Sequence, residues 1–449
     1  MDDMIKSKPF IQERIAIVRI SQDKLASIPE QEIEQRNIKR ADEAIVMVSK
    51  HQGYSSFKGR KQLRRKASKL TGKQHVKSSR KVSKGATATL KGHKHKSVGA
   101  KVNKPLIKPL KRLSKPKRVR AKPSQVSQAY RAGSEAGVQA FMTSPLESNP
   151  RLLLNRNYWR WATRNGMKPE GKKYQLEATR YAAGYCKSMR LAAIDWVPLP
   201  TERSVAVILS ITGNEMNVGK VLNQLHRLPL QELVVVANGV DDDTFAIIHK
   251  HPAQPMIVHY DTAIGYDVGR AIGAKITVSD ILLFVDGDIV IAAEKLVPFV
   301  RVIDQGGSLA LNNISPYLGT LSDWDPVTVV KAFVNRTLGR GDLAANSLTA
   351  VPHALSRSAV DKIGYSSLAV PPLAQAQMIR AGLQVSAPAS VDVISLNRLR
   401  PTNQGLGNPV ENLIVGDHLE ALASVMELSG ERIDYPDLMR ERSFGEAAP

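Results

Sequence analysis

The stretch Ile281-Leu282-Leu283-Phe284-Val285-Asp286-Gly287-Asp288 places two carboxylates directly after five apolar residues. An apolar run this short predicts a strand that is buried on both faces, as strands of a parallel sheet are. Gly287 permits a sharp turn at the carboxyl end of that strand. Ligands of open α/β sheets bind at this end, so the two acids are candidates to hold a cation such as Mg2+, which takes further oxygens from substrate phosphates. A solvated Asp-Gly turn explains the same eight residues equally well.

Strand and helix patterns alternate on both sides of this stretch. The expected strands are 205–209, 233–237, 256–259, 281–285 and 309–312, and the expected helices between them are 218–228, 244–251 and 266–278. This alternation predicts an α/β fold with a doubly wound, mostly parallel sheet, whose right-handed crossovers bring the carboxyl ends of the strands to one edge. The sequence has neither a P-loop nor a Gly-x-Gly-x-x-Gly motif after a strand, which argues against those nucleotide-binding sites.

The positive charge of the chain is concentrated in one segment. The formal net charge is +23, and residues 58–122 contain 25 Lys and Arg but no Asp or Glu. The remaining 39 basic and 41 acidic residues nearly cancel. The basic segment predicts disorder, because its scattered apolar residues cannot offset the entropy of the chain. Unspecific contact with a polyanion (nucleic acid, anionic lipid or a wall polymer) and an inert tether are both open interpretations.

Changes in composition predict five parts of the chain. They are a small N-terminal module over 1–50, a disordered Lys/Arg-rich linker over 51–125, a helical lead-in over 126–200, a sheet domain over 201–400, and a C-terminal loop and helix over 401–449. Within the N-terminal module we expect a short strand within 15–20 and a helix over 29–48. In the lead-in, Gly133 and Gly137 lie four residues apart, a spacing that permits close packing between helices.

Cysteine content and hydropathy predict the compartment. The only cysteine, Cys186, rules out a disulfide within the chain, fits a reducing environment and is expected to be a small buried apolar residue. No secretory signal and no apolar run long enough to span a bilayer appears. We therefore expect a cytoplasmic protein without a transmembrane segment, which could dock peripherally at the inner face of an anionic membrane.

Residues 203–395 resemble the nucleotide-sugar-binding half of a glycosyltransferase of family 2, whose fold is of the GT-A type. Four segments carry the resemblance, and their order and spacing are more specific than any one of them. They are Ile208-Leu209-Ser210-Ile211-Thr212-Gly213-Asn214-Glu215, Val234-Val235-Val236-Ala237-Asn238-Gly239, Gly265 with Arg270-Ala271-Ile272-Gly273, and the DxD motif Phe284-Val285-Asp286-Gly287-Asp288.

The resemblance implies a role for one side chain or more in each segment. Glu215 is a nucleotide contact, and Asn238, where the family usually has an acid, contacts a base or ribose. Arg270 faces the diphosphate, which a guanidinium matches well. Asp288 holds the metal, Mg2+ or Mn2+, and Asp286 holds the ribose or the metal. The implied donor is a nucleoside-diphosphate sugar, and the acceptor is unknown.

The acceptor half departs from the family. Where the family places the Asp that removes a proton from the acceptor hydroxyl, this chain has Val370-Pro371-Pro372-Leu373-Ala374-Gln375. Asp417 and His418 are the candidates to replace that base, and His418 is also a candidate metal ligand. Asp417 with Glu420 is equally typical of a capping box for a helix over 418–429.

Other polar residues have simpler interpretations. His249, His251 and His259 lack metal-ligand spacing and are expected at the surface or in the core, and Asp325 is expected to cap the helix that follows it.

The resemblance implies a metal-dependent glycosyltransferase that, like the family, inverts the configuration of the transferred sugar. Two other functions stay open. One is a sugar-nucleotide-binding protein with weakened catalysis, which the proline pair Pro371-Pro372 suggests. The other is a polyanion-binding protein that acts through residues 58–122.

Overall fold

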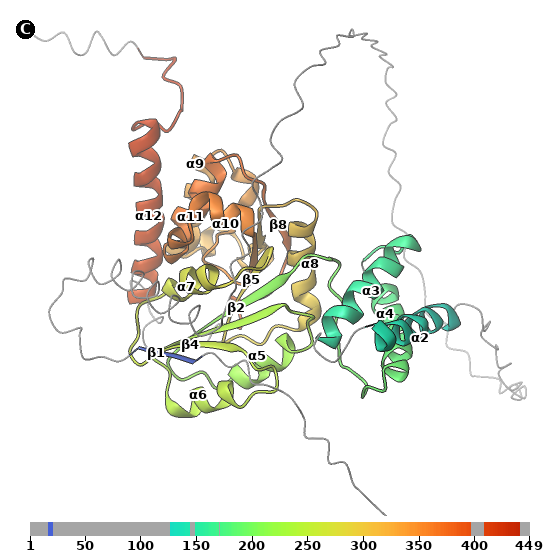
Figure 1. The fold of residues 1–449 in the computed structure, drawn as a ribbon. Helices are drawn as coiled ribbons and strands as arrows, with labels where there is room; N and C mark the ends of the chain where they lie inside the picture. The colour runs from blue at the N-terminus through green and yellow to red at the C-terminus, as the bar shows by residue number, and fades with distance from the viewer. Residues whose placement is uncertain (1–16, 21–125, 144–148, 170, 397–407, 441–449) are drawn as a thin grey trace, which may run out of the picture. The chain divides into compact units, whose positions relative to one another are not determined.

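Figure 1 shows the chain as a computed structural model, which describes residues 17–20, 126–143, 149–169, 171–396 and 408–440. The expected helix over 29–48 and the linker over 51–125 lie outside these described residues. Within the described ranges, no helix combines the length and the apolar content that crossing a bilayer requires.

The described residues form an eight-stranded sheet in the order β1-β4-β3-β2-β5-β7-β6-β8. Neighbouring strands from β1 to β5 run parallel, β7 runs antiparallel to β5 and β6, and β8 is parallel to β6. The strands are β1 (Ile17–Ile20), β2 (Val205–Thr212), β3 (Glu232–Asn238), β4 (Met256–Tyr260), β5 (Ile281–Asp286), β6 (Leu309–Asn312), β7 (His353–Ser356) and β8 (Val385–Ala389). The expected α/β fold with a doubly wound, mostly parallel sheet is confirmed.

Helices cover both faces of the sheet (Figure 1). The helices of the sheet domain are α5 (Val218–Leu225), α6 (Asp242–His249), α7 (Val268–Ile276), α8 (Ala293–Asp304), α9 (Pro326–Thr337), α10 (Arg357–Ile363), α11 (Pro371–Arg380) and α12 (Pro409–Ser429), of which α12 packs against α9 and α11. Alternate residues of β5 pack to opposite sides: Leu283 joins the core under α5 and α8, whereas Phe284 joins the core under α7, α10 and α11. Strand β5 is therefore buried on both faces, as expected.

The strand order places a topological switch at β2. From β2 the chain proceeds through β3 and β4 on one side, and then returns to form β5 on the other side of β2. In open α/β sheets the carboxyl ends of the strands at such a point border a crevice where ligands bind. Asn238 and Asp286 end the two strands that flank β2.

The lead-in consists of three helices, α2 (Val126–Thr143), α3 (Pro150–Arg164) and α4 (Gly171–Ser188). Helices α2 and α4 pack so closely that a Cβ on Gly133 would come within 2.0 Å of the carbonyl oxygen of Tyr181. A Cβ on Gly184 would come within 2.1 Å of the carbonyl oxygen of Tyr130. The expected close packing at the glycines is confirmed.

The caps explain where some helices begin. Asp325 caps α9, since its Oδ1 accepts a hydrogen bond from the Thr328 backbone at 2.7 Å, as expected. Asp241 caps α6 in the same way, so this helix begins at Asp242 and not at Thr244. The C-terminal helix differs more from expectation: α12 begins at Pro409, nine residues before the expected start.

Candidate functional site

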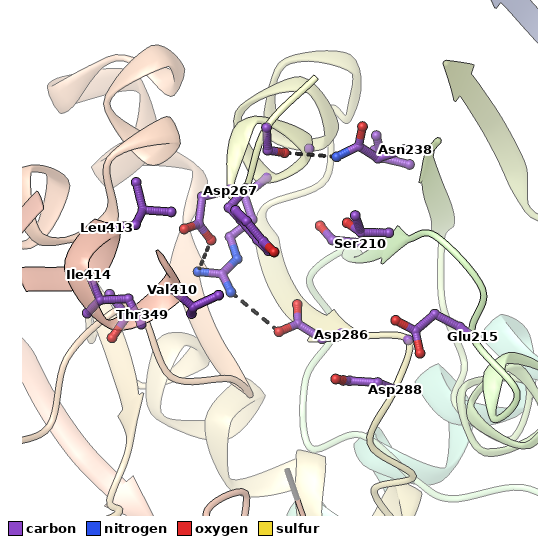
Figure 2. Close-up of a pocket in the computed structure, with 17 residues that line it drawn as sticks. Ser210, Glu215, Asn238, Asp267, Asp286, Asp288, Thr349, Val410, Leu413 and Ile414 are labelled. Carbon is purple, nitrogen blue, oxygen red and sulfur yellow. Dashed lines mark hydrogen bonds and ion pairs between the residues drawn. The ribbon is translucent and has the colours of Figure 1, made fainter. Parts of the chain in front are cut away.

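A cavity of about 260 Å3 lies at the carboxyl ends of β2, β3 and β5. The cavity is bordered by these strand ends, by the start of α7, and by the first turns of α12 (Figure 2). Its lining residues are Ser210, Thr212, Glu215, Val236, Asn238, Gly265, Tyr266, Asp267, Gly269, Arg270, Asp286, Gly287, Asp288, Thr349, Val410, Leu413 and Ile414. Five of the seven side chains predicted for the site, those of Glu215, Asn238, Arg270, Asp286 and Asp288, are thus brought together.

The turn after β5 lets both of its acids reach the cavity. A Cβ on Gly287 would come within 2.8 Å of Ile211 Cγ1, so glycine is required for this close approach to β2. The Gly287 backbone donates a hydrogen bond to the Ser210 carbonyl at 2.9 Å, which ties the turn to β2. Burial raises the pKa of Asp286 to about 6, Arg270 opposes this shift, and the nearby carboxylate of Asp288 adds to it. A cation between the two acids would relieve this repulsion.

Arg270 lines the cavity and contacts two carboxylates, those of Asp267 and Asp286, and dashed lines mark these interactions in Figure 2. Its Nη1 is 2.8 Å from Asp267 Oδ1, its Nη2 is 3.5 Å from Asp286 Oδ2, and Nη1 also donates to the Leu348 carbonyl at 3.3 Å. Burial lowers the pKa of Arg270, but Asp267 and Asp286 outweigh that effect and raise it overall. The guanidinium therefore stays charged, and its orientation is fixed by the two acids.

Sequence reasoning missed Asp267. Burial raises its pKa, against the opposing effect of Arg270. Its backbone has a φ of 61°, a left-handed conformation that is uncommon outside glycine. The sequence did contain a signal for this pair: Asp267 lies three residues before Arg270 at the start of a helix, a spacing at which an acid and a base can form an ion pair. The left-handed residue also explains why α7 begins at Val268 and not at Tyr266.

Asn238 uses its side-chain amide within the protein. Its Nδ2 donates to the Gly265 carbonyl at 2.8 Å, and its Oδ1 accepts from the Ile264 backbone at 2.7 Å. The side chain thereby holds the loop that carries Tyr266, whose exposed ring also lines the cavity. Glu215, on the loop after β2, is buried and also lines the cavity.

The charge of the cavity lining is strongly negative. Four carboxylates line it, those of Glu215, Asp267, Asp286 and Asp288, against the one guanidinium of Arg270. Among the described residues, no group of three or more His, Cys, Asp or Glu side chains is arranged to hold a metal ion. Asp286 and Asp288 nevertheless fit Mg2+ or Mn2+, since such ions need only one or two protein carboxylates when substrate phosphates and water supply the other oxygens.

The two candidates for a base lie outside the cavity lining. Both belong to the interior of α12, and the cap of this helix is Asn408, whose side chain accepts from the Glu411 backbone at 2.9 Å. The expected capping box of Asp417 and Glu420 is therefore wrong. The Asn-Pro pair at 408 and 409 was the signal that could have located the helix start.

His418 is 2% exposed and fully hydrogen-bonded. Its Nδ1 lies 2.7 Å from the Ile414 carbonyl, and its Nε2 lies 3.1 Å from the Ser347 hydroxyl. These partners suit a neutral ring that donates from Nδ1 and accepts at Nε2. Burial lowers the pKa of His418 to about 4, which also favours the neutral ring near pH 7.

The segment that stands where the family has its acid begins α11. Pro371 and Pro372 are both buried in the first turn of this helix. One turn later, Gln375 Oε1 accepts from the Leu348 backbone at 2.7 Å, and Gln375 Nε2 donates to Asn335 at 2.7 Å. The segment 370–375 therefore supports the backbone next to Thr349, which lines the cavity. The segment contributes no acid to the cavity.

Other polar residues occupy the positions expected of them. His251 and His259 are buried and His249 is half-buried, and Cys186 is a buried free thiol.

One family model matches part of the sheet domain. The model of glycosyl transferase family 2 matches residues 207–363, which confirms the resemblance seen in the sequence. A search of curated proteins found no match.

Three solved structures illustrate the similarity to known folds. A glucosyl-3-phosphoglycerate synthase from Mycobacterium tuberculosis, in complex with Mn2+, uridine diphosphate and glucosyl-3-phosphoglycerate, is 18% identical, with a TM-score of 0.37 over 53% of this chain and 82% of that chain. A mannosyl-3-phosphoglycerate synthase from Rubrobacter xylanophilus is 14% identical, with a TM-score of 0.36 over 54% and 80%. A mannosyltransferase from Pyrobaculum calidifontis, in complex with GDP-Man and Mn2+, is 13% identical, with a TM-score of 0.29 over 66% and 87%.

Proposed function

We propose that the protein transfers a sugar from a nucleoside-diphosphate sugar to an acceptor hydroxyl. The match of residues 207–363 to the model of glycosyl transferase family 2 supports this proposal. The charge of the cavity is the observation that supports this most directly. Its lining carries four carboxylates and one guanidinium, so a diphosphate could enter only together with a cation. A protein that binds sugars or neutral ligands alone would have no need of this charge.

Asp288 and Asp286 are the residues that would hold Mg2+ or Mn2+. The metal, when bound, would neutralise charge that develops on the leaving diphosphate. Asp267 keeps the guanidinium of Arg270 directed at Asp286, and Arg270 thereby places a second positive charge beside the diphosphate. Because both partners of Arg270 are acids, the guanidinium alone cannot offset the charge of the donor.

The nucleoside would contact the part of the cavity lining that includes Glu215 or Asn238, both of which line the cavity. Glu215 is a candidate direct contact. Asn238 acts on the nucleoside through the loop that it holds, since both polar atoms of its amide bind the backbone at Ile264 and Gly265. This differs from a direct base contact, which the resemblance implied.

Attack by the acceptor hydroxyl, with inversion at the sugar, needs a base within hydrogen-bonding reach. Part of the cavity wall consists of Thr349, Val410, Leu413 and Ile414, and this part offers no carboxylate. Asp417 and His418 remain our candidates for the base. They lie one turn beyond Ile414 along α12, so either would have to act after α12 shifts or through water.

The absent acid also supports a second candidate function, a sugar-nucleotide-binding protein with weakened catalysis. A third proposal concerns residues 58–122, whose charge suits unspecific contact with a polyanion, including the anionic inner face of a membrane in a cytoplasmic protein.

Release of nucleoside diphosphate from a panel of nucleoside-diphosphate sugars distinguishes the first two functions. We expect release with one donor in Mn2+, and a loss of roughly 100-fold in D288N. Asp243→Asn, which alters an exposed acid on α6, is the matched control and should leave the rate unchanged. Binding of a donor without release from any member of the panel would favour the weakened protein.

A further inference from the structure

The first turns of α12 give the cavity an aliphatic wall. Four of the side chains that line the cavity are aliphatic, and three of these, Val410, Leu413 and Ile414, belong to α12. Their spacing of three and four residues places them on one face of the helix, and Figure 2 shows them apart from Glu215 and Asp288. The cavity therefore offers an apolar surface as well as the acids that would hold the metal.

In the part of the chain that the structure describes, the aliphatic wall lies outside the core that holds α12 in place. The apolar core between α11 and α12 includes Ala421 and Val425, which lie further along the helix. Leu413, in contrast, is 40% exposed, and Val410 and Ile414 are half-buried. Aliphatic surface left in water is unfavourable, and a cluster of it in a cavity is typical of a site that binds the apolar part of a ligand.

The segment 347–349, which joins the cavity lining to α12, offers little to a polar ligand. The Ser347 hydroxyl lies 3.1 Å from His418 Nε2, and the Leu348 carbonyl accepts from Arg270 at 3.3 Å. Thr349 lines the cavity, but its hydroxyl oxygen is buried. These polar groups are used within the protein or closed to solvent, so they would not replace the water that a hydroxylated acceptor loses on binding.

We propose that Val410, Leu413 and Ile414 form an apolar subsite, which takes a short alkyl or aryl group that the acceptor carries beside its reacting hydroxyl. The three positions span about 6 Å along the helix axis, so a group of a few carbon atoms covers them. Identifying the bound molecule as the acceptor rests on the proposed transferase function, whereas binding of an apolar group does not. The proposal makes the acceptor a small alcohol with an apolar part, in place of a free sugar or an acidic molecule.

A series of alkyl β-D-glucosides with methyl, butyl and hexyl chains tests the subsite in EDTA, without donor and below micelle-forming concentrations. We expect the affinity for the wild type, measured by saturation-transfer-difference NMR, to rise roughly twofold with each added methylene group, because the wall covers only one side of the chain.

Leu413→Gln should remove this dependence on chain length while it keeps a similar helix propensity. Leu419→Gln is the matched control, since Leu419 lies on the same helix, is 53% exposed and does not belong to the lining of the described cavity. This control should keep the full dependence. Val410→Thr, which keeps the shape of the side chain and adds a hydroxyl, should weaken the dependence and decides the matter if L413Q does not fold.

Three results would overturn the subsite: an affinity that does not change with chain length in the wild type, an unchanged dependence in L413Q, or an equal loss in L419Q. The last result would place the alkyl chain on the outer surface of α12. Retention of the wild type, but not of L413Q, on neutral phosphatidylcholine vesicles would assign the apolar group to a lipid and overturn its assignment to a small molecule.

Binding that depends on chain length as described, in a protein that releases nucleoside diphosphate from none of the donors, would contradict the proposed function and leave the subsite intact.

Discussion

Arg270 decides how the cavity balances its charges. Its guanidinium is bound to Asp267 and lies 3.5 Å from Asp286, so one positive charge is shared by two acids. With Glu215 and Asp288, four acids line the cavity against this one guanidinium, which favours entry of a cation over entry of an anion alone. We therefore expect the metal to bind before the diphosphate or together with it.

Lys331 gives a prediction about stability and pH. Burial lowers its pKa to about 8, whereas a lysine in an unfolded chain titrates at about 10.4. Between these values the unfolded chain holds a proton that the folded protein has lost, so the contribution of Lys331 to stability rises with pH. Chemical denaturation at pH 7.5 and pH 10 should show the wild type gaining up to about 3 kcal/mol relative to K331M.

The exposed Lys250 provides the control for this pH prediction. Relative to K250M, the wild type should gain far less between the same two values of pH. A difference between wild type and K331M that stays constant with pH would mean that Lys331 is paired in the folded protein.

At the scale of single residues, the sequence locates the site better than it explains the contacts. Glu215, Asn238 and Asp286 could be predicted because each lies at or just after the carboxyl end of a strand, and parallel strands bring these ends together. Two contacts could not be predicted, because both join separate elements. They are the hydrogen bond from the Asn238 amide to the backbone of another loop and the pairing of Arg270 with Asp286.

At the scale of elements, helix packing sets the tolerance for substitution. Gly184 in α4 faces the backbone of α2 with no room for a methyl group, whereas Gly416 in α12 is exposed and a Cβ there would have nothing within 4 Å. Both glycines lie inside helices, where alanine has the higher intrinsic propensity. The same substitution should therefore have opposite effects at the two positions.

We expect Gly184→Ala to destabilise the protein by about 1–3 kcal/mol or more, because the helices must move apart. Gly416→Ala should stabilise it by about 0.5–1 kcal/mol through helix propensity alone. Urea denaturation of the two variants checks both values. If Gly184→Ala proved as stable as the wild type, the close contact between α2 and α4 would be refuted.

The element that the sequence misplaced is α12. Asp417 and Glu420 have the spacing of a capping box, but they lie within a helix that begins at Pro409. Local spacing cannot distinguish a cap from an ordinary pair of acids on a helix face. The choice depends on Asn408, which lies nine residues earlier and uses its side chain to cap the first turn. As a result, Val410, Leu413 and Ile414 were missed as lining residues.

At the scale of the whole molecule, the sheet was the most predictable feature. Short apolar runs that alternate with helices specify a parallel sheet, and the polar residues that end these runs mark the edge where ligands bind. The antiparallel β7, which lies between β5 and β6, depends on a chain reversal that periodicity does not encode. The boundaries of the five expected parts remain predictions.

The basic part of the chain, residues 58–122, lies outside the described residues. All the residues that line the described cavity fall between 210 and 414, so deleting 58–122 should leave donor binding and turnover unchanged. Binding to inorganic polyphosphate or to anionic vesicles should be lost, and in the intact chain it should weaken steeply with salt. A variant in which an uncharged linker of equal length replaces 58–122 is the control. Loss of turnover in that variant would show that the basic segment takes part in catalysis.

The central claim, that Asp286 and Asp288 hold a cation which binds a diphosphate, is tested most directly by titration calorimetry. UDP and GDP would be titrated into wild type, D288N and D243N, in Mn2+ and in EDTA. We expect at least one nucleotide to bind the wild type and D243N in Mn2+, and binding to be at least roughly 10-fold weaker in EDTA and in D288N. Equal affinity with and without the metal, or an unchanged affinity in D288N, would contradict it.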